Sequence, residues 1–564
     1  MTFRSNVVSW FPRNRSRDSW VLYISMFVLG GCGLAYEYTL SKVASDLLGN
    51  SVQQWAIIIG VMMFFMGVGS DLQKYFRDEK LFDKFLFFEI LLGILGGFGP
   101  ILMLYIFGTF QSHYILFQYT LISLIGLIIG FEIPLITRIN DAYTKELKVN
   151  LGGVLKMDYI GALFGALIWI FLLPMFFTII ESAFVLGIAN IAIAAGTLYY
   201  FRNLVVHRQE LTALILLALV GLTSGLGQAQ DWTLNAQQYL YRDPIVFSET
   251  TRYQHIVLTR SRAGDISCFI NGHLQFNSFD EHIYHENLVH PAFAVAPQHK
   301  QVLVLGGGDG LAVREILKYP DVETVTVCDI DPMMTQLARE NPYLVEMNQN
   351  SFKDSRVTTI RNHALVEVGK EEIVIPNHNL LFRGKPKEVA EVYLVHLDAA
   401  VFVKQISGVF DIIIIDLPDP NSLELAKLYS LEFYVEVAKK LAANGILVQQ
   451  STSPVHAKEA FLCIGRTMQA AGLTAVPYHD NVPSFGEWGW WITCKPGWLD
   501  AAELKASLHS IQSIPVPVKY LTAELVRASV EFGKNQLDAR NFEVSTQMNN
   551  RIYEYYLEAW KRGV

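Results

Sequence analysis

Cysteine is scarce in this chain of 564 residues, which has five, and no two of them form a CxxC pair. An odd number of scattered cysteines does not make a disulfide framework, and the paired spacing of a structural zinc site is missing. The sequence therefore predicts a fold without disulfide bridges or structural zinc. The cysteines are Cys32, Cys268, Cys328, Cys463 and Cys494.

Charged residues are also few, at 17% of the chain, and the net charge is −8. This acidic balance argues against a nucleic-acid partner, because nucleic-acid-binding proteins present basic surfaces. Hydrophobic residues make up 51% of the chain, and the mean hydropathy is +0.28. Since this is too apolar for an ordinary soluble protein of this length, much of the chain is expected to lie in a lipid bilayer.

Long apolar runs occupy most of the first 230 residues, which predicts a basic tail over 1–18 and a transmembrane helical domain over 19–230. Each run has about the 20 residues needed to span a bilayer. The first is too long for a removable signal peptide and lacks a cleavage pattern. The small-residue runs "GALFGAL" and "FMGVGS" are expected to pack helices closely. The predicted spans are 20–40, 52–71, 85–107, 114–136, 151–176, 180–200 and 211–227.

Lysine and arginine are unevenly distributed among the loops. The N-terminal tail and the second, fourth and sixth loops are basic, whereas the third and fifth contain neither residue. By the positive-inside rule the basic segments face the cytoplasm. Seven crossings then put everything after Gln228 on the outer side of the cell (inner) membrane.

Five acidic residues lie in or at the edges of the predicted spans: Glu37, Glu89, Glu132, Asp158 and Glu181. A charge within a bilayer is costly, so such residues often mark a path or a site for a cation. Glu89 and Glu181 stand near span ends, and we interpret them as reaching interfacial water. For the other three, a cation site and a structural pairing between helices both stay open.

After residue 230 the apolar blocks shorten. The segments "IVLTR" and "ISCFING" alternate like strands, which predicts a small β region over 231–298. From residue 301 the apolar runs "QVLVLG", "TVTVCDID", "VYLVHLD", "DIIIID" and "GILVQQ" are separated by helical patterns. This alternation predicts a Rossmann-like, doubly wound α/β domain over 299–500. The remaining segment, 501–564, is expected to be a helical tail that packs on the domain or on the membrane surface.

Acidic residues follow these predicted strands. Asp309 stands inside the turn "GGGDG", where a loop that binds phosphate would disfavour a carboxylate. Asp329 ends the next strand, at the spacing of an acid that binds ribose hydroxyls, and Asp398, Asp416 and Asp419 follow two further strands. The carboxyl ends of the strands form the ligand edge of such a sheet. Five acids there predict a nucleoside that carries a positive charge.

The segment "VLVLGGGDGLAVREILKYPDVETVTVCDIDP", with "DIIIIDLPDPNSLELAKLYSLEFY" and "GILVQQ", resembles the spermidine synthases, which are aminopropyltransferases. The likeness extends over 247–495 and includes "RYQHIVLTR", "FINGHLQF" and "DEHIYHENLVHP" in the family's order. With its apolar N-terminal half and "PSFGEWGWW", the chain resembles the membrane-fused members. The resemblance implies transfer of the aminopropyl group of decarboxylated S-adenosylmethionine to an amine, with release of methylthioadenosine and no cofactor or metal.

The resemblance also implies a donor site in the glycine loop and at the following strand ends. Asp309 would pair with the free amine of the donor and repel the carboxylate of ordinary S-adenosylmethionine. Asp329 would hold the ribose, and Asp398 the adenine amine. The implied donor residues are Gln254, Gly306, Gly307, Gly308, Asp309, Gly310, Asp329 and Asp398.

Asp398 takes that position only if the chain contains an insertion. When the sequence is aligned straight on from "RVTTI", His363 stands where the adenine-site acid belongs. Placing "VYLVHLDAAVFV" there restores the acid at the family's spacing before Asp416. The choice implies an insertion of about 35 residues near 361–391, long enough for a flap or hairpin.

For the acceptor site, the resemblance implies Asp416 as the general base, with Asp419 beside it to hold the acceptor cation. Tyr284 and Gln450 match acceptor-pocket positions, although core packing and a strand-end turn are alternative roles for them. The identity of the acceptor stays open, because Phe485 replaces a tyrosine of the soluble members.

His285 is a second departure, because a glutamine can occupy this position in the family. His282, His285 and His290 lie in the acceptor segment without a cysteine or carboxylate ligand set, so no metal site is predicted. The expected partners are small-molecule polyamine and nucleoside sulfonium substrates and the lipid bilayer. A homo-oligomer is compatible with the resemblance, since related soluble enzymes are dimers or tetramers.

Three functions follow from this reading, and synthesis of spermidine from putrescine is preferred. An S-adenosylmethionine methyltransferase would share the fold, but Asp309 and "DLPDP" argue against it. A polyamine transporter or sensor would use the α/β half as a binding module. One conflict stands: loop charges put the catalytic half outside, while the implied donor is made in the cytoplasm. Either the substrates cross the membrane, one span is not a full crossing, or the donor is supplied differently.

Overall fold

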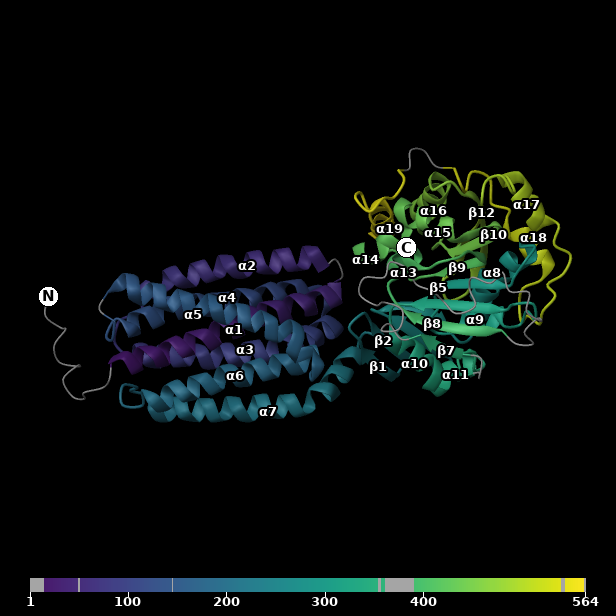
Figure 1. Ribbon diagram of the computed structural model, residues 1–564. Helices are drawn as coiled ribbons and strands as arrows, with labels where there is room; N and C mark the ends of the chain where they lie inside the picture. The colour runs from purple at the N-terminus through teal and green to yellow at the C-terminus, as the bar shows by residue number, and fades with distance from the viewer. Residues whose placement is uncertain are drawn as a thin grey trace. The chain divides into compact units, whose positions relative to one another are not determined.

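The computed structural model describes residues 15–48, 51–144, 146–353, 357–360, 390–538 and 543–561. The chain divides into two compact units, Met1–Arg242 and Asp243–Val564. The first unit is helical and the second contains both β-sheets (Figure 1). Because the last helix of the first unit continues to Gln238, the division lies beyond the expected boundary at residue 230.

Seven helices in the described part of the first unit are long and apolar enough to cross a membrane, as the sequence predicts. The helices are α1 (Arg15–Leu48), α2 (Ser51–Leu72), α3 (Leu81–Thr109), α4 (Tyr114–Asn140), α5 (Leu147–Leu167), α6 (Ile179–Tyr200) and α7 (Arg208–Gln238). Six of them contain the whole predicted span, whereas α5 ends at Leu167 and the rest of the fifth span continues as a π-helical turn, Ile168–Leu172, and a 3-10 turn, Leu173–Met175.

The two small-residue runs bring helix backbones into contact. A methyl group added at Gly161 of α5 would lie 1.8 Å from the carbonyl oxygen of Phe27 in α1. One added at Gly69 of α2 would lie 2.2 Å from the carbonyl oxygen of Leu127 in α4. The prediction that these runs pack helices is therefore confirmed.

The buried acids correct one expectation. Glu89 is 0% exposed, so it does not reach interfacial water. It lies two turns inside α3, and the Nδ2 atom of Asn190 in α6 donates to its Oε2 at 3.1 Å. Glu132 is 2% exposed, and among the described residues no ion pair includes either carboxyl group. Glu181 does occupy a helix end, where it forms the capping box of α6 with Thr178.

The basic loops are tied together at one end of the helical unit. Arg138, at the end of α4, donates to the carbonyl oxygen of Gln73 in the loop before α3 at 3.0 Å. Asp83, at the start of α3, accepts from the backbone N–H groups of Val206 and His207 in the loop before α7. The segments that carry lysine and arginine thus share one end, as the positive-inside pattern requires.

The second unit begins with a small antiparallel sheet in the strand order β1-β2-β3-β4. Asn271 and Gly272 both have positive φ angles, 50° and 82°, as a tight hairpin turn between two strands requires. This sheet is the predicted β region. Its strands are β1 (Ile245–Thr250), β2 (His255–Arg260), β3 (Ile266–Ile270) and β4 (His273–Asn277).

The main sheet has the order β11-β12-β10-β9-β5-β6-β8-β7, parallel from β10 to β7, with β11 and β12 antiparallel at one edge. All five strands predicted after residue 301 are present. The strands are β5 (Gln301–Gly306), β6 (Thr324–Asp329), β7 (Val357–Ile360), β8 (Glu391–His396), β9 (Phe410–Asp416), β10 (Leu441–Gln450), β11 (Thr474–Val482) and β12 (Gly486–Cys494).

Helices cover both faces of this sheet, which makes it doubly wound (Figure 1). Val302 and Val304 of β5 point into one core with α8 and α9, while Leu303 and Leu305 point into another with α15 and α16. The helices are α8 (Glu281–Val295), α9 (Leu311–Ile316), α10 (Pro332–Glu340), α11 (Pro342–Met347), α13 (Ala399–Gln405), α14 (Leu423–Ala426), α15 (Leu431–Lys440), α16 (Lys458–Ala470), α17 (Ala501–His509), α18 (Ala523–Ser529) and α19 (Arg551–Lys561).

The predicted insertion near 361–391 and His363 fall almost wholly outside the described residues. The sheet nevertheless bears on the alignment, because β8 and not β7 is the neighbour of β6. Asp329 of β6 pairs in register with His396 of β8. Asp398 therefore follows the strand next to that of Asp329, which is the arrangement that the insertion implies.

Candidate active site

The glycine loop after β5 runs between the ends of two neighbouring strands. Gly306 has a φ of 86°, and a Cβ there would lie 1.9 Å from the carbonyl oxygen of Asp416. A Cβ at Gly308 would lie 2.5 Å from Oδ2 of Asp329, which accepts from the Gly308 N–H at 3.0 Å. Side chains at these positions would push the loop away from the acids. Gly307 and Gly310 complete the turn before α9.

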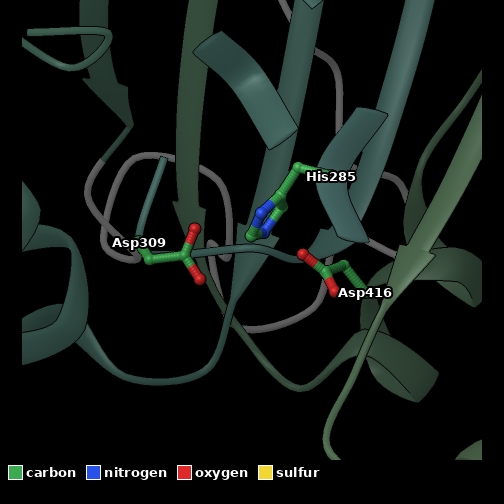
Figure 2. Close-up of side chains that lie close together, drawn as sticks. All are labelled: His285, Asp309 and Asp416. Atoms are coloured by element: carbon green, nitrogen blue, oxygen red, sulfur yellow. The ribbon is translucent and has the colours of Figure 1, made fainter. Parts of the chain in front are cut away.

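Asp309 and Asp416 face each other across this turn. One ligand atom from each, and one from His285, all lie within 4.8 Å of one another. Figure 2 shows the imidazole of His285 between the two carboxylates. Among the described residues, these three form the one group of His, Cys, Asp or Glu side chains spaced closely enough to hold a metal ion. The same oxygens could equally accept hydrogen bonds from an ammonium group.

Asp416 ends β9, and the Tyr284 hydroxyl of α8 donates to its Oδ1 at 2.7 Å. Burial raises the pKa of Asp416, against the effects of His285 and of this hydrogen bond. Burial raises the pKa of Asp309 to about 6, although the charge of His285 and the N–H of Leu311 lower it. In both carboxyl groups the effect of burial outweighs the stabilising contacts, so each pKa lies above the ordinary value of an aspartate.

His285 is held by a buried ion network. Its Nδ1 contacts Oε2 of Glu281 at 3.0 Å, and Arg314 of α9 donates to both oxygens of Glu281, at 2.8 and 2.9 Å. Although burial lowers the pKa of His285, the hydrogen bond and charge of Glu281 raise it overall. Burial opposes ionisation of Glu281, but His285 and Arg314 lower its pKa to about 2. From the sequence, His285 is a departure from the family and a histidine without carboxylate partners, because Asp309, Asp416 and Glu281 approach it only in the fold.

Asp419 and Gln450 meet beside Asp416. Gln450, the last residue of β10, donates through Nε2 to Oδ1 of Asp419 at 3.3 Å and to the Tyr429 hydroxyl at 3.0 Å. Burial raises the pKa of Asp419 to about 6, opposed by hydrogen bonds from Gln450 and from Tyr556 of α19. Gln450 thus joins the segment after β9 to Tyr429 and does more than end a strand. The sequence did not indicate that Tyr556 reaches this site.

The other predicted donor residues line the next strand ends. Asp329 accepts from the N–H of Asp331 at 2.8 Å, and burial raises its pKa to about 7 despite this bond. Asp398 caps α13 and pairs with Lys427 at 2.6 Å. The loop of Gln254 is linked to this edge, since Thr251 accepts from the Gln254 N–H and donates to Asp331. The predicted residues therefore belong to the strand ends and an adjoining loop, and within the described part of the chain no hydrogen bond or ion pair joins Asp398 or Gln254 to Asp309 or Asp416.

Comparison with known proteins shows the family of this chain. A family model described as spermine/spermidine synthase domain matches residues 281–373 and 365–499. The polyamine aminopropyltransferase of Leptospira interrogans is 34% identical over 552 residues, covering 96% of this chain and 99% of its own. Polyamine aminopropyltransferase 1 of Streptomyces coelicolor is 36% identical over 552 residues, covering 96% and 94%.

The chain belongs to the polyamine aminopropyltransferases. Polyamine aminopropyltransferase 1 of Ralstonia nicotianae, 34% identical, is covered over 97% of both chains, so the likeness includes the helical unit. It therefore extends well beyond the 247–495 segment that the motifs indicated. A crystal structure of spermidine synthase with the transition state analogue AdoDATO aligns over 52% of this chain and 88% of its own, with 22% identity and a TM-score of 0.41. Membership of this family makes the protein a transferase enzyme.

Proposed function

We propose that this aminopropyltransferase is an integral membrane enzyme that makes spermidine from putrescine and decarboxylated S-adenosylmethionine. The observation that carries the proposal is the opposed pair Asp309 and Asp416, with Asp419 beside it. Three features support it: two partly buried carboxyl groups with raised pKa values, a tyrosine that donates to one of them, and a third acid for a second ammonium group. Seven apolar helices support the membrane assignment.

The donor is proposed to lie along the strand ends. The glycine loop from Gly306 to Gly310 allows close approach, Asp329 binds the ribose hydroxyls, and Asp398 holds the adenine amine. Gln254 is a further donor-site residue. Asp309 pairs with the free amine of the donor, which supplies the positive charge that the buried carboxyl group lacks. Ordinary S-adenosylmethionine has a carboxylate that this position would repel.

In the proposed reaction, one amine of the acceptor attacks the methylene carbon next to the sulfonium. A C–N bond forms, the C–S bond breaks, and its electron pair leaves on the sulfur of methylthioadenosine. Asp416 takes the proton of the attacking amine, and Tyr284 orients the Asp416 carboxylate. Asp419 and Gln450 hold the far amine. Since the sulfonium is a good leaving group, the enzyme supplies alignment and a base.

The test uses the purified full-length protein in detergent with decarboxylated S-adenosylmethionine and a panel of amines. Putrescine should give spermidine and methylthioadenosine in equal amounts, measured by mass spectrometry. Preference for another amine would overturn the acceptor assignment. Absence of methylthioadenosine with every amine would overturn the whole proposal.

A further inference from the structure

The C-terminal helix α19 packs beside the acceptor side of the site. Its buried face shares a hydrophobic core with the segment that follows Asp419. The chain before α19 is also fixed, because the N–H of Leu431 donates to the carbonyl oxygen of Ser545 at 2.8 Å, and the N–H of Ser545 donates to Thr467 at 3.1 Å. The segment from Ser545 through α19 is therefore packed into the catalytic unit. The shared core includes Ile552, Tyr553, Tyr556 and Ala559 of α19 with Ala426, Leu428 and Tyr429.

One side chain of this helix reaches the acids. Tyr556 is 5% exposed, and its hydroxyl forms a hydrogen bond with the Asp419 carboxyl group. Gln450 donates to the same carboxyl group at 3.3 Å. Asp419 is thus held from two sides, by the end of β10 and by the tail.

Phe485 offers no hydroxyl to the acceptor side of the site. Phe485, which stands where soluble relatives are expected to have a tyrosine, packs its ring 6.2 Å from that of Tyr284 and carries no polar atom. A tyrosine from α19 therefore brings a phenol to the acceptor acids from a different part of the chain. Tyrosine donates a hydrogen bond to a carboxylate and loses little conformational freedom when it does so.

We propose that Tyr556 is a positioning residue of the acceptor site: by orienting the Asp419 carboxylate, it lets the tail select diamines over monoamines. The inference rests on the proposed function, in which Asp416 takes the reacting amine and Asp419 the second ammonium group. A monoamine has nothing to pair with Asp419. Loss of the Tyr556 hydroxyl should therefore weaken binding of diamines and leave that of monoamines unchanged.

The test compares Tyr556→Phe with the wild-type protein. The acceptors are 1,4-diaminobutane, which is putrescine, and 1-aminobutane, and the readout is methylthioadenosine release. For 1,4-diaminobutane, KM should rise about ten-fold, equal to about 1.4 kcal/mol, while kcat stays within about two-fold. The kcat/KM for 1-aminobutane should not change. If 1-aminobutane is not a substrate, its inhibition constant against 1,4-diaminobutane takes the place of kcat/KM.

Two further variants separate positioning from a structural role. Tyr555 lies on the same helix, and its hydroxyl accepts from the N–H of Glu543 at 3.3 Å. Tyr555→Phe should therefore leave the kinetic constants for both acceptors unchanged. In an Asp419→Asn background, Tyr556→Phe should add no further rise in KM, because both changes act on one contact. An unchanged KM in Tyr556→Phe, or an equal loss with both amines, would overturn the inference. A wild-type protein that releases no methylthioadenosine would instead overturn the proposed function.

Discussion

At the scale of single residues, the site is a set of partly buried acids. Asp309, Asp329 and Asp419 all have raised pKa values, because burial disfavours the charged form more than the surrounding donors favour it. The charge of His285 acts on Asp309, but His285 is itself engaged with Glu281. The proposed donor and acceptor both carry positive charge, which would favour the ionised carboxylates. The site is therefore suited to bind cationic substrates.

The pH dependence of donor binding follows from Asp309. Its pKa of about 6 lies above the ordinary value of 3.8, so the carboxyl group is ionised above about pH 6 and protonated below it. Only the ionised form pairs with the donor amine. We therefore expect kcat/KM for the donor to fall as the pH is lowered through about 6, in steady-state assays of methylthioadenosine release. A flat profile between about pH 5 and 7 would contradict this.

The proposed pairing of Asp309 with the donor amine also predicts how the donor is selected. Asp309→Asn removes the charge that repels the carboxylate of S-adenosylmethionine while nearly keeping the shape of the side chain. The inhibition constant of S-adenosylmethionine should fall relative to the KM of the decarboxylated donor, by about ten-fold or more. Asp321→Asn, a change of the same kind at a half-exposed carboxylate, is the control. Unchanged donor preference in Asp309→Asn would refute the selectivity role.

At the scale of elements, the sequence predicted what is local. The strands around Asp309, Asp329 and Asp416 are continuous apolar runs that end in acids, and such runs fold as buried parallel strands. The expectation for Glu89 was wrong, because its depth depends on where α3 begins and on Asn190 of α6. Tyr556 was missed for the same reason: the pattern of α19 predicts an apolar face, but it does not say which acid that face meets.

The close contact of α1 and α5 gives a prediction for the helical unit. Gly161→Ala places a methyl group 1.8 Å from the Phe27 carbonyl oxygen, so the two backbones must separate. This should destabilise the protein by about 1–3 kcal/mol and lower its Tm in detergent. Gly152→Ala on the same helix meets nothing within 4 Å and should leave the Tm unchanged or raise it. Equal Tm values for the two variants would show that α1 and α5 do not pack through Gly161.

At the scale of the whole molecule, seven apolar helices and an α/β unit belong to one chain, and curated relatives match both. The loop before α7 lies at the basic end of the helical unit, since its backbone bonds to Asp83. Helix α7 begins at this basic end, at Arg208, and runs to the other end of the helical unit. If the basic end faces the cytoplasm, the catalytic unit follows on the opposite side.

A reporter fused after Val564 measures this directly. Alkaline phosphatase, which is active only outside the cytoplasm, should be active at this position, while green fluorescent protein should not fluoresce there. Fusions in the loop before α7 should give the reverse pattern. A fluorescent, phosphatase-inactive C-terminal fusion would mean that one of the seven helices does not cross, and it would resolve the conflict over donor supply.

The central claim is that the acids at the strand ends carry out aminopropyl transfer. Its most direct test is the initial rate of methylthioadenosine release from decarboxylated S-adenosylmethionine and putrescine by the wild-type protein and by Asp416→Asn. With the general base removed, kcat should fall by about a hundred-fold to ten-thousand-fold, while the protein keeps its Tm. An Asp416→Asn protein with wild-type kcat would contradict the account.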